Sequence, residues 1–423
     1  MSGKMKSTVV ALFMLAMAQV SVCQNNTISP YSKYGIGLYE QMGHGRNTSM
    51  GGVGIALRSE RYVNTINPAS YASLDSTMVL FDIGVHMDYE HIETHLDSGD
   101  KMNGNVSYFS LTMAPSDRLG ISFGLAPYTS VGYTLQSKEY VSGGGEDRYM
   151  SYVEGLGGLT WAYVGLGVDL FKHTSLGMNA SILFGPKTER QSMAMTSADE
   201  FSIYIEKTDY YTGGKLDFGL QQDIPLSKNK TLTIGAIAST PGILRCSRKE
   251  IATNTFYRIG LIDTVYFDDD DYDRYTKLPP TFGFGVSYSK AGRFTMSGDF
   301  NYNPLSKLDV EDLRSKLIDN KSINIGCEFI PKKLGHSNDL VNDLVFRAGG
   351  GFESGICRVD HYTLKSFKLS AGVGFRIRSI RFNTYCMYKQ QGTLDNLLVL
   401  HQSLQFGLNL TYIDYWFQKR RFY

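Results

Sequence analysis

Apolar residues at every second position, repeated along most of the chain, restrict its fold more than any other feature. In residues 78–89, Val79, Phe81 and Ile83 fall on one side of an extended chain, and Asp82 and Asp88 fall on the other. Successive side chains of a strand point to opposite faces, so this pattern predicts a strand with one apolar face. The sequence contains fourteen such segments: 78–89, 106–114, 119–126, 157–170, 174–185, 215–222, 231–239, 281–289, 294–302, 322–330, 344–353, 367–377, 380–388 and 404–412.

The connections between these segments alternate in length. Short or intermediate ones are 115–118, 171–173, 223–230, 290–293, 331–342 and 378–379, whereas the long ones are 90–105, 127–156, 186–214, 240–280, 303–321, 354–366 and 390–403. Outer-membrane barrels join their strands by short periplasmic turns and long outer loops in turn. We therefore predict an all-β fold, a transmembrane antiparallel β-barrel of about 14 strands over residues 77–423, with both chain ends in the periplasm.

Composition excludes other classes of protein. The formal charge is +1, which lacks the basic excess typical of nucleic-acid binding. Mean hydropathy is −0.19, and beyond the N-terminus no apolar run reaches the roughly 18 residues of a membrane helix. A barrel strand has only one apolar face, so this average is compatible with a barrel.

The N-terminus is typical of a secretory signal. Lys4 and Lys6 precede an apolar run over residues 8–20, and Ser21 and Cys23 are small residues at cleavage positions. We predict a cleaved signal peptide, 1–23, and export to the bacterial outer membrane. The alternative is a lipoprotein acylated at Cys23, from whose usual pattern Val22 departs.

Four cysteines remain after cleavage, and none of them forms a CxxC pair: Cys246, Cys327, Cys357 and Cys386. Cys327 and Cys386 fall on strand faces and are interpreted as packing residues. A disulfide between Cys246 and Cys357 and a pair of free thiols both remain open.

Residues 24–76 lack strand alternation and are rich in Gly, Ser and Asn. A barrel of about fourteen strands is too wide for its own side chains to fill, so we predict that this segment plugs the lumen. Its motif residues suit a tight packed turn, because glycine permits close backbone approach and proline keeps the preceding residue extended. These residues are Gly51, Gly52, Gly54, Asn67, Pro68 and Ala69.

The glycine run, the later Asn-Pro-Ala and the barrel behind them resemble the FadL-like outer-membrane transporters of hydrophobic compounds. The leader 29–37 is similar to that of poorly characterised FadL-like barrels in Bacteroidetes. The resemblance implies a hatch over 24–76 with the six motif residues in structural and gating roles, no cofactor, and an unidentified ligand-binding site. The motifs are also similar to shuttle barrels of the type IX secretion system.

The C-terminus contains Tyr415, Trp416, Phe417 and Tyr423. It resembles the aromatic-ended signal that barrel-assembly machinery recognises in its clients. We therefore expect the barrel-assembly machinery, outer-membrane lipid and lipopolysaccharide as partners of a monomeric barrel.

Enzymatic motifs are missing from the sequence, which contains no GxSxG elbow and no paired-histidine metal motif. His91 and His95 have ligand spacing only on a helix, and we predict a solvated loop there. The acidic run 268–271 with Asp273 lacks the glycine and distal Glu of a calcium loop, and Gly143–Gly145 has no following Lys. We predict no catalytic residue, no metal and no cofactor.

Two functions follow from these expectations. The first is passive uptake of hydrophobic small molecules, such as long-chain fatty acids or aromatic hydrocarbons. The alternative is a binding or scaffold barrel that engages exported proteins, as a type IX secretion shuttle does. Residues 240–280 are acidic and tyrosine-rich, which favours protein contact over lipid capture.

Overall fold

The computed structural model describes residues 27–140, 148–195, 201–256, 261–307, 315–331, 344–355, 357–359, 362–395 and 398–416. The expected signal peptide, the C-terminal aromatic residues 417 and 423, Gly143–Gly145 and most of connection 331–342 lie outside these residues.

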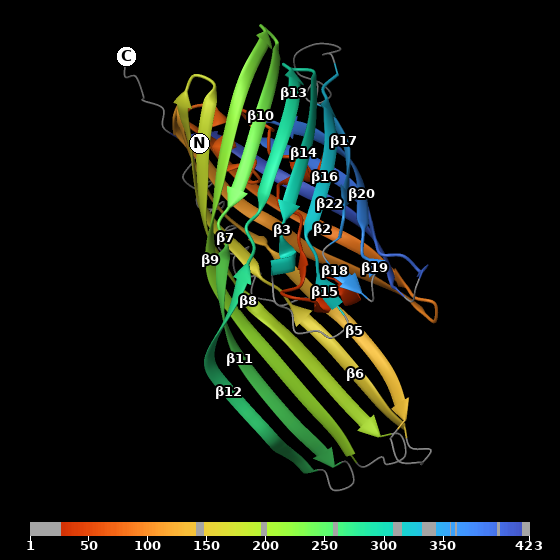
Figure 1. Ribbon diagram of the computed structural model, residues 1–423. Helices are drawn as coiled ribbons and strands as arrows, with labels where there is room; N and C mark the ends of the chain where they lie inside the picture. Colours follow the sequence, from red (N-terminus) through yellow and green to blue (C-terminus); the bar gives the residue numbers. More distant parts are fainter. Residues whose placement is uncertain are drawn as a thin grey trace.

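Fourteen of the described strands close into one antiparallel barrel (Figure 1). The closure is the ladder between the first and last barrel strands, which runs from Met78↔Tyr415 to Glu93↔Leu400. In order around the wall, the strands are β2 (Met78–Glu93), β3 (Ser98–Ser116), β4 (Leu119–Pro127), β7 (Thr160–Phe171), β8 (Thr174–Met195), β9 (Phe201–Ser227), β10 (Lys230–Ser239), β13 (Phe282–Lys290), β14 (Phe294–Asn303), β16 (Asn320–Phe329), β17 (Val345–Glu353), β20 (Ser366–Ile377), β21 (Ile380–Gln391) and β22 (Leu400–Tyr415).

These fourteen strands coincide with the fourteen predicted segments, so the predicted fold class is confirmed. The short connections lie at one end of the barrel, which we call the short-turn end; the opposite end is the outer end. The expectation that the long connections are loops is wrong for 90–105, 127–156, 186–214 and 240–280, whose described residues are largely strand. Thr, Tyr, Val and Ile are frequent in these stretches, and such residues favour extended chain over loop.

The barrel wall is apolar outside and polar inside. Along β2, Val85, Met87 and Tyr89 are 42%, 43% and 46% exposed, whereas Asp82 and Asp88, on the opposite face, are buried. The other strands present similar outward side chains, including Phe284, Ile325 and Leu369. This outward apolar surface is what a strand that crosses a bilayer requires. Among the described residues, no helix is long and apolar enough to cross a membrane.

A second feature is an outer sheet, which we define as the extensions of β8 and β9 beyond the barrel together with two hairpins. These hairpins are β5 (Thr129–Tyr140) with β6 (Arg148–Gly157), and β11 (Gly242–Phe256) with β12 (Leu261–Leu278). β6 pairs with β8 and β11 pairs with β9, and the sheet projects far past the barrel (Figure 1). β9 has 27 residues, about 90 Å at strand rise, whereas a tilted strand crosses a bilayer with about 10.

Glycines mark the point where the first hairpin leaves the barrel wall. Gly157, Gly158 and Gly185 have φ of +115°, +141° and +152°. The Gly158 N–H donates to the Pro186 carbonyl at 2.9 Å. Residues with a side chain rarely adopt these backbone conformations. Glycine therefore permits the sheet to continue as β6–β8 where the β7–β8 pairing ends.

Residues 27–76, which we call the inner segment, contain four short elements. They are η1 (Pro30–Lys33), β1 (Leu38–Tyr39), α2 (Gly45–Ser49) and η2 (Pro68–Ser73). At the outer end, η3 (Leu305–Lys307) and a small sheet of β15 (Ser315–Leu317), β18 (Cys357–Val359) and β19 (Tyr362–Thr363) complete the described fold.

Candidate functional site

A charged cluster, which we call the arginine latch, joins the inner segment to the barrel wall. Arg46 of α2 donates to Glu328 of β16 through Nε at 3.0 Å and through a terminal nitrogen at 2.9 Å. Arg347 of β17 donates to the same carboxylate through Nε at 2.8 Å. All three side chains are buried. Removing one member of such a buried ion pair leaves an uncompensated charge, so the latch resists separation of the segment from the wall.

Tyr62 of the inner segment completes the latch by stacking against guanidinium groups. Its ring centroid lies 5.0 Å from Arg46, 5.1 Å from Arg347 and 4.3 Å from Arg381. Arg347 also donates to the Tyr62 hydroxyl at 2.8 Å. Cation–π contact with this half-buried tyrosine adds attraction without a second carboxylate.

A second contact joins α2 to β2. The Nδ1 atom of His44 lies 2.7 Å from Asp82 Oδ2, and the imidazole stacks on the Tyr108 ring at 3.9 Å. Thr411 donates to the other oxygen of Asp82 at 3.1 Å. Asp82 therefore has partners on both oxygens, as a buried carboxylate requires.

The glycines of the predicted hatch motif place backbone against the wall. Gly51 and Gly52 have φ of +73° and +84°, and the Gly51 N–H donates to Ser370 at 2.8 Å. The N–H groups of Gly54 and Ile55 donate to Asp299 Oδ2 at 2.6 and 2.9 Å. Only glycine readily adopts the positive φ seen at Gly51 and Gly52, so this turn depends on these two glycines.

The Asn67-Pro68-Ala69 motif meets the glycine turn at Ile55. Asn67 Nδ2 donates to the Ile55 carbonyl at 2.7 Å and to the Leu220 carbonyl of β9 at 3.2 Å. Its Oδ1 accepts the Ala69 N–H at 3.1 Å and so caps η2, which starts at Pro68. The structure thus brings the six motif residues into one bonded unit, while their gating role stays a prediction.

Wall glycines make room for this unit. A Cβ at Gly177 would overlap the backbone of Pro68 and Ala69, and one at Gly219 would overlap the Asn67 side chain. Gly285 lies in the same way against Ile55. These strand glycines therefore admit the inner segment close to the wall.

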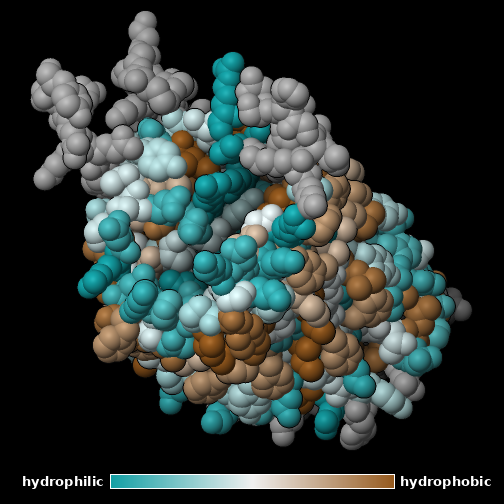
Figure 2. Space-filling model, turned by 90° about the horizontal axis from the view of Figure 1, so that it is seen from above, coloured by the Kyte–Doolittle hydropathy of each residue, from teal (hydrophilic) through white to brown (hydrophobic). Residues whose placement is uncertain are grey.

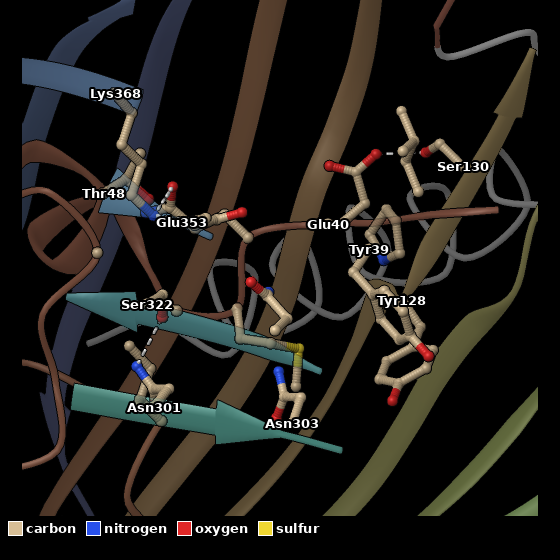
Figure 3. Close-up of a pocket in the computed structure, with 18 of the residues that line it drawn as sticks. Tyr39, Glu40, Thr48, Tyr128, Ser130, Asn301, Asn303, Ser322, Glu353 and Lys368 are labelled. Atoms are coloured by element: carbon tan, nitrogen blue, oxygen red, sulfur yellow. Dashed lines mark hydrogen bonds and ion pairs between the residues drawn. The ribbon is translucent and has the colours of Figure 1, made fainter. Parts of the chain in front are cut away.

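A cavity of about 380 Å³ remains between the inner segment and the outer-end strands (Figure 3). Its lining combines apolar residues with polar and charged ones, including Lys215, Asp217, Glu353 and Lys368. The ligand-binding residues were unidentified from the sequence, and this cavity is the strongest candidate for such a site in the described part of the chain.

An apolar cluster borders this cavity at the outer end. Tyr31, Leu305, Leu317, Leu364 and Leu398 are buried together, and we call them the outer cap. The Tyr31 hydroxyl donates to the Val399 carbonyl at 2.7 Å and accepts the Val399 N–H at 2.9 Å. The inner segment is thus anchored at both ends of the lumen.

Ion pairs stabilise the outer sheet. Arg248 of β11 holds Asp209 of β9 at 2.6 Å. Glu206 accepts the Tyr204 hydroxyl at 2.6 Å and Arg190 Nε at 2.9 Å. The hydrogen bond from Tyr204, and to a smaller extent the one from Arg190, lowers the pKa of Glu206.

Two further predictions concern the outer end. Cys246 is a buried free thiol, and the side chain of Cys357 lies outside the described residues. His91 lies on β2 and its Nδ1 atom is 2.7 Å from Asp100, so it occupies a strand and not the loop we expected.

The latch residues were missed from the sequence, although a signal for them is present. Asp299, Glu328 and Arg347 interrupt strands whose outward positions are apolar, and all three fall on inward positions. A charged residue at an inward strand position needs a partner inside the barrel. The inner segment supplies partners for Asp299 and Glu328, and Glu328 and Arg347 also pair with each other across the wall. The sequence does not show which of these residues pair.

The architecture and lumen can now be compared with known proteins. The family model described as BamG matches residues 4–423. The chain belongs to the BamG family. No curated protein matches this BamG-family sequence.

Solved structures show the same fold. The Pseudomonas putida toluene transporter TodX has a TM-score of 0.55 and 14% identity, over 90% of this chain and 100% of that one. The Ralstonia pickettii toluene transporter TbuX gives 0.57 and 12%, over 88% and 98%. A Pseudomonas aeruginosa FadL homologue gives 0.57 and 12%, over 89% and 99%. This BamG-family barrel therefore has the FadL-like fold.

Proposed function

We propose that this chain is a plugged outer-membrane barrel that presents its outer sheet to other proteins of the outer membrane. The observation that carries the proposal is the continuation of β8 and β9 into a sheet beyond the bilayer. Strands that only span a membrane need no such extension. The outer sheet adds four further strands, β5, β6, β11 and β12, to these extensions.

The surface of β12 suits protein contact. Val265, Phe267 and Tyr275 are 59%, 58% and 60% exposed. Aromatic residues are enriched where protein interfaces form. In the described ladders β12 pairs only with β11, and an edge strand is able to accept a further strand.

The anchored lumen supports the same role. Passage through the barrel requires the inner segment to move, and the arginine latch and the outer cap oppose that movement at both ends. A barrel whose plug stays in place still serves as a fixed support for the outer sheet.

The partner follows from the family. The name BamG associates the family with the barrel-assembly machinery, and we propose that this barrel engages that machinery or the exported proteins it handles. The role is non-enzymatic and needs no cofactor. Outer-membrane lipid and lipopolysaccharide surround the apolar belt.

Site-specific crosslinking tests the proposal. A photoreactive amino acid at Phe267, on the outer sheet, is expected to crosslink components of the barrel-assembly machinery in living cells. The same group at Phe284, which lies on the apolar outer face of β13, is the matched control. Crosslinks to those components at neither position, or equally at both, would count against a docking role of the sheet.

Uptake of hydrophobic compounds is the second candidate. Two observations favour it: the likeness to toluene transporters and the cavity inside the lumen. Cells with and without the gene are compared for uptake of labelled toluene and long-chain fatty acids. Equal rates in the two strains exclude transport of these compounds and leave the docking proposal intact.

A further inference from the structure

Two neighbouring barrel strands present a grid of polar side chains to the cavity. The cross-strand pairs Asn301↔Ser322 and Asn303↔Asn320 of β14 and β16 line the cavity. Asn324 also lines it, whereas its cross-strand partner Asp299 binds the inner segment. The outward neighbours on the same strands, Phe300 and Ile323, are 44% and 53% exposed. Side chains directly across an antiparallel pair lie about 5 Å apart. The grid is thus a compact hydrogen-bonding surface, part of which is visible in Figure 3.

Several polar atoms around the cavity lack a protein partner. Among the described residues, the side-chain carbonyl oxygens of Asn303, Asn320, Asn324 and Gln391 and the amide nitrogen of Gln41 accept or donate no hydrogen bond. Asn324 and Gln391 are each only 5% exposed. Buried amides without partners are costly, and either ordered water or a ligand with hydroxyl groups is able to complete those around this cavity.

Several charged groups that line the cavity have protein partners. Lys215 lies 3.0 Å from Asp217, Lys368 lies 3.7 Å from Glu353 and His86 lies 3.0 Å from Asp88. A ligand with a net charge would compete with these pairs. Besides the cation Lys389, the groups that such pairs leave to bind a ligand are neutral amides, each with donor and acceptor atoms.

Aromatic rings face the cavity on another side. The rings of Tyr39 and Tyr128 meet edge to face at 5.5 Å, and Figure 3 shows both across the cavity from Asn301 and Asn303. Trp161 lines the same space. Rings offer an apolar surface next to polar groups, which fits a molecule with hydroxyl groups on its edge and C–H groups on its faces.

We propose that this cavity binds a neutral, hydroxyl-rich ligand of the saccharide class through the amide grid of β14 and β16. Asparagine side chains match vicinal hydroxyl groups because each offers a donor and an acceptor. The site is independent of the outer sheet, so it stands whether or not the docking proposal holds.

Equilibrium dialysis of the full, detergent-purified barrel tests this site with radiolabelled glucose, N-acetylglucosamine and maltotriose, and with toluene as the apolar probe. We expect saturable binding of at least one sugar and none of toluene at the same site. The double variant Asn303→Leu with Asn320→Leu keeps side-chain size and removes four hydrogen-bonding atoms. It is expected to bind about tenfold more weakly, since a site built for hydrogen bonds discriminates strongly.

The control is Asn229→Leu, in the exposed turn between β9 and β10, which should bind as the unmodified protein does. Trp161 reports the location: in a Trp416→Phe background it is the single tryptophan, and bound sugar should change its fluorescence. Absence of saturable binding for all three sugars, or equal affinity in the double variant, would overturn the proposal. If the double variant fails to fold, Ser322→Ala, a smaller change in the same grid, replaces it.

Discussion

Arg46 of the inner segment and Glu328 of the barrel wall form a two-point hydrogen bond, at 3.0 and 2.9 Å, although 282 positions separate them in the chain. Arg347 adds a third bond to the same carboxylate. One acidic side chain therefore links the inner segment to two neighbouring wall strands, β16 and β17. Because Glu328 lies on a strand that cannot move independently, the coupling fixes the inner segment to the barrel.

Replacing this carboxylate should destabilise the protein strongly. Glu328→Gln keeps the size of the side chain but leaves Arg46 and Arg347 without a counter-charge, and breaking a buried pair in this way costs about 3–5 kcal/mol. The measurement is the urea midpoint for loss of the heat-resistant folded form on gels.

The matched control for that variant is Glu206→Gln. Glu206 pairs with Arg190 on the outer sheet, where both side chains are partly exposed. Exposed pairs are worth about 0–1 kcal/mol. Equal shifts of the midpoint in the two variants would show that the latch is not a buried network.

Adding a methyl group at Gly177 should displace η2. A Cβ there overlaps the backbone of Pro68 and Ala69, and overpacking of this kind costs about 1–3 kcal/mol. Gly298→Ala is the control, because nothing lies nearer than 3.9 Å to its added Cβ. Limited proteolysis within 59–75 reports the displacement. Resistance of Gly177→Ala equal to that of Gly298→Ala would contradict the packing of η2 on the wall.

The barrel could be predicted from sequence because the relevant information is local. Each strand shows its own alternation, as Val85, Met87 and Tyr89 do, and a bilayer demands that alternation in every strand. The outer sheet was not predicted, because its four added strands β5, β6, β11 and β12 alternate apolar and polar residues only over short stretches, such as 131–136, and are rich in polar residues beyond them. Their partners are extensions of β8 and β9, which looked like loops for the same reason.

The candidate site was only partly accessible from sequence. Gly51 and Asn67 could be identified because residue type alone restricts the backbone there: glycine permits positive φ, and the proline after Asn67 keeps Asn67 extended. The partners of Arg46 and the amide grid of Asn303 and Asn320 depend on which strands become neighbours. That neighbourhood follows from closure of the whole barrel, a non-local property of the chain.

Acid should loosen the outer sheet at Glu206. Hydrogen bonds from Tyr204 and Arg190 lower the pKa of this carboxyl in the folded state. Its contribution to stability is therefore complete above the unfolded pKa of about 4.3, and it is lost as pH falls through the lower folded value. The measurement is the hydrogen-exchange rate of β9 in Glu206→Gln divided by the rate in the unmodified protein. The ratio should exceed one at neutral pH and approach one in acid; a ratio that does not change with pH would rule out this role.

Removing the β11–β12 hairpin should leave the barrel intact. β10 and β13 pair directly, from Lys230↔Lys290 to Ala238↔Phe282, so the wall closes without the residues between them. A variant in which residues 245–275 are replaced by a short Gly-Ser turn is expected to reach the outer membrane and to keep the heat-resistant form on gels. Its urea midpoint should shift by less than that of Glu328→Gln, since the hairpin contributes no contact to the latch. In the same cells, crosslinks of a photoreactive group at Tyr210, on the part of β9 in the outer sheet, should change if the hairpin holds the partner. Loss of the folded barrel in this variant would contradict the prediction and would show that the outer sheet is required for closure.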